Sequence, residues 1–333
     1  TLLVKREPFS EEEIEHLKTF SAARSFDTAY YPGIGANEGN YYNRLRNDWF
    51  HDAAIALLGD DPEGFLNQYK FNLHPASDDQ PYFFHFFRWK TLPEVLRLHN
   101  QGGATLAEAG YLVLVATLVQ AIMASLILIL LPIWLYQRFI NPARYTTSRT
   151  RLIGYFLLLG LAFLFIEIAF IQKLLLFLHH PLYAIAVVLS SFLVFSGLGS
   201  AWFGQSKAAN RGRLIAMAIS GIVIIGMTYL FTLDPLLQQL KTAPDGMRIL
   251  VSVIVIAPLA FCMGIPFPSG LAQLADFAPG LIPWAWAING CASVISAILA
   301  TLLAIHLGFT LVIAIALVMY ALTLWMFPVP CEE

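Results

Sequence analysis

The hydrophobic positions of this chain follow two patterns that meet near residue 100. From about residue 109 onward, apolar runs of 20 or more residues recur between short polar stretches. Each run is long enough to cross roughly 30 Å of hydrocarbon as a helix that rises about 1.5 Å per residue. The runs lack the two-residue alternation of membrane β-barrel strands. We therefore predict seven transmembrane helices, at about 109–136, 152–177, 181–203, 214–233, 249–271, 284–304 and 308–327.

The first 100 residues have the pattern of a water-soluble α/β segment. Residues 1–5 and 26–31 are predicted strands, and between them Ser10 and Glu13 have the spacing of a capping box that begins a helix. Further helices are expected over 43–58, from Pro62 toward Tyr69, and over 92–98. The sequence thus predicts two domains, a soluble one at 1–100 and a transmembrane one at 101–333.

Composition supports a membrane protein and excludes one class of partner. Hydrophobic residues make up 58% of the chain and charged residues 13%, which is rare for a soluble domain. The net charge is -2, and no basic cluster is interleaved with aromatic residues, so nucleic acid is not expected as a partner. The three cysteines, Cys262, Cys291 and Cys331, lack the spacing of metal ligands, and we expect no metal site.

Several polar residues fall inside the predicted spans. Glu167 lies near the middle of the second, where a carboxylate costs at least about 2.5 to 3.5 kcal/mol on insertion scales. It is either a cation or proton site, or a hydrogen-bonded residue that fixes helix packing. Asn289 and Gln120 either line a site or bond between helices. Lys173 is expected to extend to the membrane interface from the end of its span.

The run GIPFPSG, residues 264–270, breaks the fifth predicted span. Pro266 and Pro268 remove two backbone donors and free carbonyls upstream, and Ser269 follows them. Broken helices form substrate sites in transporters. The alternative is a kinked end of the span near the interface. In the soluble part, Asp78 and Asp79 are a candidate contact for a cationic amine, or else a turn whose carboxylates cap local amides.

Five stretches together resemble one protein family. They are PASDDQPYFF (75–84), FIEIAFIQK (165–173), SGLGS (196–200), GIPFPSG (264–270) and PWAWAING (283–290). The chain resembles the C-terminal part of the membrane-integrated spermidine synthase-like proteins of bacteria. Gln80 departs from the pattern, which has a basic residue there, so charge pairing with Asp78 or Asp79 does not carry over.

The resemblance implies a fold and an activity for the whole protein. The soluble part would be the end of a doubly wound nucleotide-binding-type domain, preceding a seven-helix bundle in a mainly α membrane protein. The family implies an aminopropyltransferase acting on decarboxylated S-adenosylmethionine, or related S-adenosylmethionine chemistry, with a polyamine or other small amine as substrate. We expect its glycine-rich loop and catalytic acids upstream of Thr1, so no catalytic residue or bound cofactor is assigned within this chain, which alone would be inactive.

The resemblance also implies the bacterial cytoplasmic membrane, a lipid bilayer as partner and a cytoplasmic soluble part. Positive charges do not settle the orientation, because six lie on the side of the soluble part and seven on the other. A different function is a transporter or channel-like module for a cationic or small polar solute, using Glu167, Asn289 and the broken helix. A third alternative is a plain anchor. The oligomeric state is left open.

Overall fold

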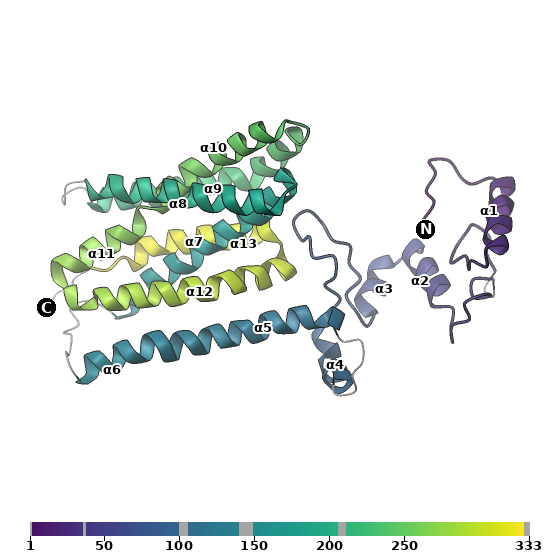
Figure 1. The fold of residues 1–333 in the computed structure, drawn as a ribbon, viewed down its shortest axis with the longest axis horizontal. Coiled ribbons are helices and arrows are strands. Elements are labelled where there is room, and N and C mark those ends of the chain that lie inside the picture. Colours follow the sequence, from purple (N-terminus) through teal and green to yellow (C-terminus); the bar gives the residue numbers. More distant parts are fainter. Residues whose placement is uncertain (1, 36–37, 100–105, 140–148, 206–210, 330–333) are drawn as a thin grey trace. The chain divides into compact units, whose positions relative to one another are not determined.

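The computed structural model describes residues 2–35, 38–99, 106–139, 149–205 and 211–329, and within them the chain forms helices and loops without a strand (Figure 1). It divides into two compact units. The first comprises residues 1–75 and 86–105, and the second comprises 76–85 and 106–333. The short segment 76–85 therefore belongs with the membrane helices, although it precedes them by some twenty residues in the chain.

Short, individually capped helices make up the first unit. The Ser10 hydroxyl accepts from the Glu13 amide and the Glu13 carboxylate accepts from the Ser10 amide, which confirms the predicted capping box. Asp48 and Asp61 cap the next two helices through their side chains. The helices of this unit are α1 (Glu11–Ala23), α2 (Trp49–Leu58), α3 (Pro62–Gln68) and α4 (Leu92–His99).

The predicted α/β character of this unit is wrong for the residues described. Residues 2–5 and 26–31 form no strand, and Thr1 lies outside the described residues. A strand is stabilised by pairing with a neighbour, and no neighbouring strand is present in the described chain. Asp27 instead accepts hydrogen bonds from the backbone amides of Tyr41, Tyr42 and Asn43, and residues 26–31 form a loop.

Seven apolar helical stretches in the described part of the second unit are long enough to cross a membrane, as the sequence predicted. They run over 110–136, 150–178, 181–204, 211–239, 245–277, 279–307 and 309–326. The corresponding helices are α5 (Leu106–Ser125) with α6 (Leu131–Phe139), α7 (Arg149–Leu178), α8 (Pro181–Gly204), α9 (Arg211–Gln239), α10 (Asp245–Met263) with α11 (Pro266–Phe277), α12 (Ile282–Leu307) and α13 (Phe309–Met326). A π-helical turn, Leu126–Leu130, joins α5 to α6.

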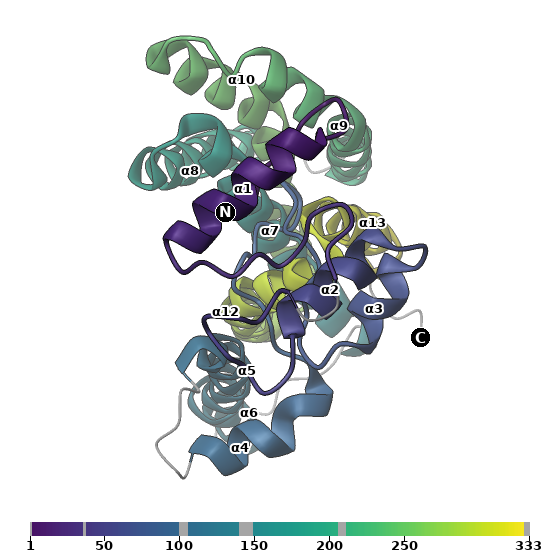
Figure 2. The ribbon, with the colours of Figure 1, turned by 90° about the vertical axis from the view of Figure 1, so that its right-hand side faces the viewer.

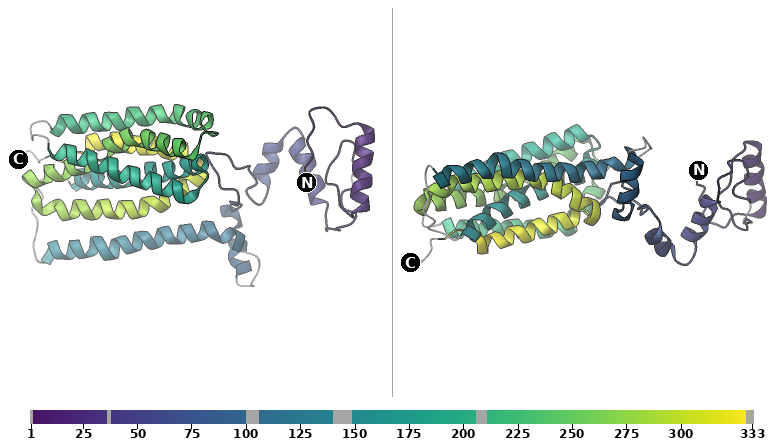
Figure 3. Two further views of the ribbon diagram at one scale, coloured as in Figure 1. Left: turned by 45° about the horizontal axis from the view of Figure 1, so that its top comes forward. Right: turned by 90° about the horizontal axis from the view of Figure 1, so that it is seen from below.

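Helix α7 is the centre of this bundle. It packs against α8, α12 and α13, while α5 packs on the outside of α12 (Figures 1 and 2). Fully buried aromatic side chains, among them Phe165 and Phe170, fill the core along α7. The views in Figure 3 show the long helices running side by side. We call the end of the bundle where α7 finishes and α13 begins the loop end, and the opposite end the far end.

Two of the glycine-containing runs pack directly against each other. A Cβ on Gly199 of α8 would collide with the carbonyl of Phe261, and a Cβ on Gly264, directly after α10, would collide with the carbonyl of Ser196. Helices α8 and α10 therefore approach each other closely through two glycines, as small residues allow in membrane bundles. The SGLGS and GIPFPSG runs are thus halves of a single contact.

Candidate functional site

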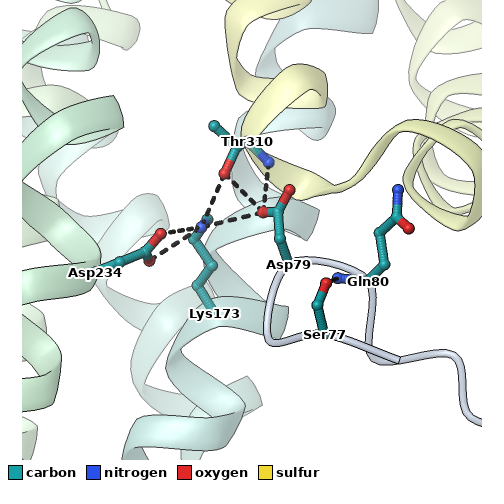
Figure 4. Close-up of polar contacts among 6 residues, drawn as sticks. All are labelled: Ser77, Asp79, Gln80, Lys173, Asp234 and Thr310. Carbon is teal, nitrogen blue, oxygen red and sulfur yellow. Dashed lines mark hydrogen bonds and ion pairs between the residues drawn. The ribbon is translucent and has the colours of Figure 1, made fainter. Parts of the chain in front are cut away.

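A buried lysine between two aspartates is the most elaborate polar arrangement in the described part of the bundle (Figure 4). Lys173, near the loop end of α7, is only 8% exposed. Its Nζ donates to the carboxylate of Asp234 on α9 at 2.9 and 3.0 Å, and to Oγ1 of Thr310 on α13 at 3.2 Å. A carboxylate oxygen of Asp79 lies 3.3 Å from the same Nζ. Lys173 is therefore buried and paired within the protein at the end of its span.

Asp79 also completes the first turn of α13. Its Oδ1 accepts from the Thr310 amide at 2.9 Å and from the Thr310 hydroxyl at 2.6 Å, and its backbone carbonyl accepts from the Phe309 amide at 3.1 Å. The first amides of a helix have no partner inside the helix, and a carboxylate at that position is also favoured by the helix dipole. Asp79 thus acts as the N-terminal cap of a helix 231 residues further along the chain.

Gly308 makes room for this cap. Its φ of +83° ends α12 and turns the chain into α13, in a conformation that glycine adopts without steric cost. A Cβ at this position would collide with the Asp79 carboxylate. The predicted spans at 284–304 and 308–327 left only a short connection here, but nothing in the pattern indicated the acidic side chain that lies over it.

Other residues fasten segment 76–85 to the loop end. The Ser77 hydroxyl accepts from the Gln80 amide at 3.1 Å, which closes the turn carrying Asp79. Nε2 of Gln80 donates to the His306 carbonyl at 3.3 Å. Tyr82 packs its ring against Phe309 with centroids 5.9 Å apart, and burial raises the pKa of its hydroxyl to about 12. The segment is therefore held by a charge, by hydrogen bonds and by an aromatic contact.

Three rings meet at the end of this segment. The Tyr111 hydroxyl is 2.9 Å from Nε2 of His306, and the His85 ring contacts both, with centroid separations of 5.0 and 5.6 Å. Partial burial, and to a lesser extent the charge that His306 can carry, lowers the pKa of His85. The neutral form of His85 is favoured as a result, which suits its place in an aromatic contact.

Glu167 stands apart from this cluster. It is 8% exposed on α7, and among the described residues its carboxyl has no hydrogen-bond or ion-pair partner. Lys173 is six residues further along the helix, or about 9 Å along the axis. Of the intramembrane polar residues that the sequence singled out, Glu167 is the buried one for which the described residues supply no hydrogen-bond or ion-pair partner.

The other candidate residues are distributed over the bundle. Asn289 donates to the Phe156 carbonyl of α7 at 3.3 Å, so it bonds two helices, while Gln120 on α5 is exposed. Phe156 is eleven residues from Glu167, or about 16 Å along α7. Asp78, unlike Asp79, is exposed. The structure therefore does not gather Glu167, Asn289 and Gln120 into one site.

The broken helix at 264–270 is packed against protein. The Tyr155 hydroxyl donates to the Pro266 carbonyl at 2.6 Å, and the buried Ser269 hydroxyl donates to the Ile265 carbonyl at 2.7 Å. These bonds satisfy carbonyls at the break. Tyr155 lies twelve residues before Glu167, so the break is about 18 Å from that carboxyl along α7 and close to the far end. After it the fifth span continues as α11 to Phe277, past the predicted end at 271.

Sequence reasoning missed the lysine cluster because its members are far apart in the chain. Asp234 lies 61 residues from Lys173, and Thr310 lies 137 residues from it. The available signal was the presence of two acidic residues, Asp79 and Asp234, at positions that a bundle of the predicted topology brings to the same end as Lys173.

No group of three or more His, Cys, Asp or Glu side chains suited to hold a metal ion occurs in the parts of the chain described. In comparisons with known proteins, no family model, curated protein or solved structure matches this chain.

Proposed function

We propose that the seven-helix unit is a membrane scaffold that fixes segment 76–85 at one membrane surface, within a membrane-integrated protein of the spermidine synthase-like kind. The observation that carries the proposal is the contact of Asp79 with the buried Lys173 and with the first turn of α13. A plain anchor needs only apolar spans. The polar contact between segment 76–85 and two distant helices also fixes the position of that segment.

The energetic cost of Lys173 supports this view. Removing an ammonium group from water costs several kcal/mol unless charges and hydrogen bonds compensate it. Asp79, Asp234 and Thr310 all contribute to that compensation. Lys173 therefore stabilises the bundle fully only when segment 76–85 is in place, which makes the ion pair specific for the docked arrangement.

The chemistry proposed for the whole protein follows the resemblance. The soluble part would face the cytoplasm, and the whole protein would transfer an aminopropyl group from decarboxylated S-adenosylmethionine to an amine, releasing methylthioadenosine and a proton. Membranes that contain the whole protein would be incubated with both substrates, and mass spectrometry would follow methylthioadenosine. Product formation supports the transferase, and its absence leaves the scaffold as a membrane protein of other chemistry. Cysteine accessibility at positions 90 and 146 tests the orientation.

The scaffold itself has a direct test. Hydrogen–deuterium exchange of the protein in lipid nanodiscs would compare the wild type with Lys173→Met. We expect faster exchange in segment 76–85 and at the start of α13, with the middle of α12 unchanged as an internal control. Exchange in segment 76–85 that is identical in both proteins would show that the lysine does not dock it, and the scaffold proposal would then fail.

A second candidate function is transport of a cationic solute or protons, and one observation favours it. Glu167 is a buried carboxyl without a hydrogen-bond or ion-pair partner among the described residues, and intramembrane acids of this kind are functional by default. Uptake of a polyamine or of protons would be measured in proteoliposomes. Transport that is lost in Glu167→Gln but kept in Gln120→Ala supports this function, whereas equal uptake by both variants excludes a role for the Glu167 carboxylate.

A further inference from the structure

We infer that Phe83 and Phe84 form a membrane anchor that inserts into the headgroup region of the bilayer at the loop end of the bundle. The two side chains are 76% and 78% exposed, although phenylalanine is among the more apolar residues. Their rings contact each other edge to face, with centroids 5.9 Å apart. They therefore form one continuous apolar projection.

The backbone around the pair directs it outward. The His85 amide donates to the Tyr82 carbonyl at 3.1 Å, so Phe83 and Phe84 are the two central residues of a turn. Both flanking side chains pack inward, Tyr82 on Phe309 and His85 on the rings of Tyr111 and His306. The turn is held from both sides, and its tip is left on the surface.

The residues that hold the turn define its level in the membrane. Tyr111 is the second residue of the span 110–136, His306 is next to the last of 279–307, and Phe309 is the first of 309–326. All three lie at the ends of helices that are long and apolar enough to cross a membrane, where a span is expected to meet the aqueous boundary. A projection fastened to them continues the apolar outer surface of the spans at the depth where amphipathic and aromatic groups collect.

The distribution of tryptophan explains why this end needs such an anchor. All five tryptophans of the second unit lie toward the far end, on α6, α8, α12 and α13: Trp134, Trp202, Trp284, Trp286 and Trp325. Tryptophan and tyrosine normally mark both interfaces of a membrane protein. The loop end has Tyr183 as an exposed aromatic residue near a span terminus, and Phe83 with Phe84 supplies the missing aromatic surface.

The test places a polarity-sensitive fluorophore at each position. In a protein whose three cysteines are replaced by alanine, Phe83→Cys and Phe84→Cys are each labelled with NBD and reconstituted into vesicles with or without brominated lipid. Two control labels give the emission and quenching expected in water and in lipid. They are Asp78→Cys, which is exposed in the same segment, and Leu128→Cys on the lipid side of the first span. Size-exclusion profiles confirm that each labelled protein is folded.

We expect emission at positions 83 and 84 to shift toward shorter wavelength than at position 78, and brominated lipid to quench it severalfold more strongly. Emission and quenching like those at position 78 would overturn the inference. A blue shift without quenching would also overturn it, because the pair would then be covered by protein. The inference rests on the docked segment of the proposed function, and deuterium exchange in 76–85 separates failure of docking from failure of insertion.

Discussion

Substitution of Asp79 separates two contributions that this residue makes to the bundle. Asp79→Ala removes both the cap on Thr310 and one of the two carboxylates at Lys173, whereas Asp79→Asn keeps a good capping side chain and removes only the charge. Lys173 keeps Asp234 at 2.9 Å in either variant, so its charge is not left alone. The two variants therefore differ by the cap, and each differs from the wild type by the ion pair.

The magnitudes follow from the exposure of the groups. Loss of a capping side chain costs about 0.5 to 2 kcal/mol. The side chain of Asp79 is 35% exposed, so solvent screens its pair with Lys173 and the loss is at most about 1 kcal/mol. We expect the free energy of unfolding to fall by about 0.5 to 3 kcal/mol in Asp79→Ala, the sum of both contributions, and by less than about 1 kcal/mol in Asp79→Asn.

Unfolding in mixed micelles of increasing dodecyl sulfate content would measure both variants, with Asp78→Ala as the control for a neighbouring carboxylate that is exposed. Equal losses in the alanine and asparagine variants would show that the cap on α13 contributes nothing. Unchanged stability in Asp79→Ala would refute the docked position of the segment.

Three further predictions concern other contacts. Gly264→Ala should cost about 1 to 3 kcal/mol through its collision with Ser196, while Gly197→Ala, which meets open space, should leave the detergent melting temperature unchanged. Tyr155→Phe leaves the Pro266 carbonyl without its donor and should cost about 1 to 3 kcal/mol in the same assay, and an unaltered melting temperature would argue against the bond. Three backbone amides lower the pKa of Asp27, so its contribution to stability is present above the unfolded pKa near 4 and is lost as the pH falls through the folded value. Hydrogen exchange of the amides of residues 41–43, corrected for its intrinsic pH dependence, should therefore become faster in acid. Asp27→Asn should remove that pH dependence.

The seven spans were predictable because each is a long apolar run, and that signal is local. Span ends were less predictable. The fourth span extends to Gln239, although Asp234 and Pro235 interrupt the apolar run at the predicted end of 233, and Asp234 pairs there with Lys173. A polar residue in a membrane helix does not end the helix when another helix supplies its partner.

The absence of strands and the presence of the lysine cluster were not predictable, because both depend on contacts between segments that are distant in the chain. Local alternation at 26–31 favoured a strand, but strand formation depends on a neighbour that a single segment does not specify. Lys173 resembles an interfacial lysine in its own helix, and only contacts with residues 79, 234 and 310 give it a buried position. Glu167, Asn289 and the prolines were recognisable as unusual residues. Only the packed structure shows that Asn289 and the prolines contact α7 far from Glu167.

The cap that Asp79 places on α13 has a consequence for the order of assembly. Segment 76–85 is synthesised before the described spans, and α13 is the last of them. The first turn of α13 is therefore completed by a residue that is synthesised before all the described spans and that meets its partner only after the last of them is made. The segment can therefore dock only after the last helix is in place. In chains that end before Thr310, the segment would remain accessible to proteases. This single contact thus couples the position of segment 76–85 to completion of the helix bundle.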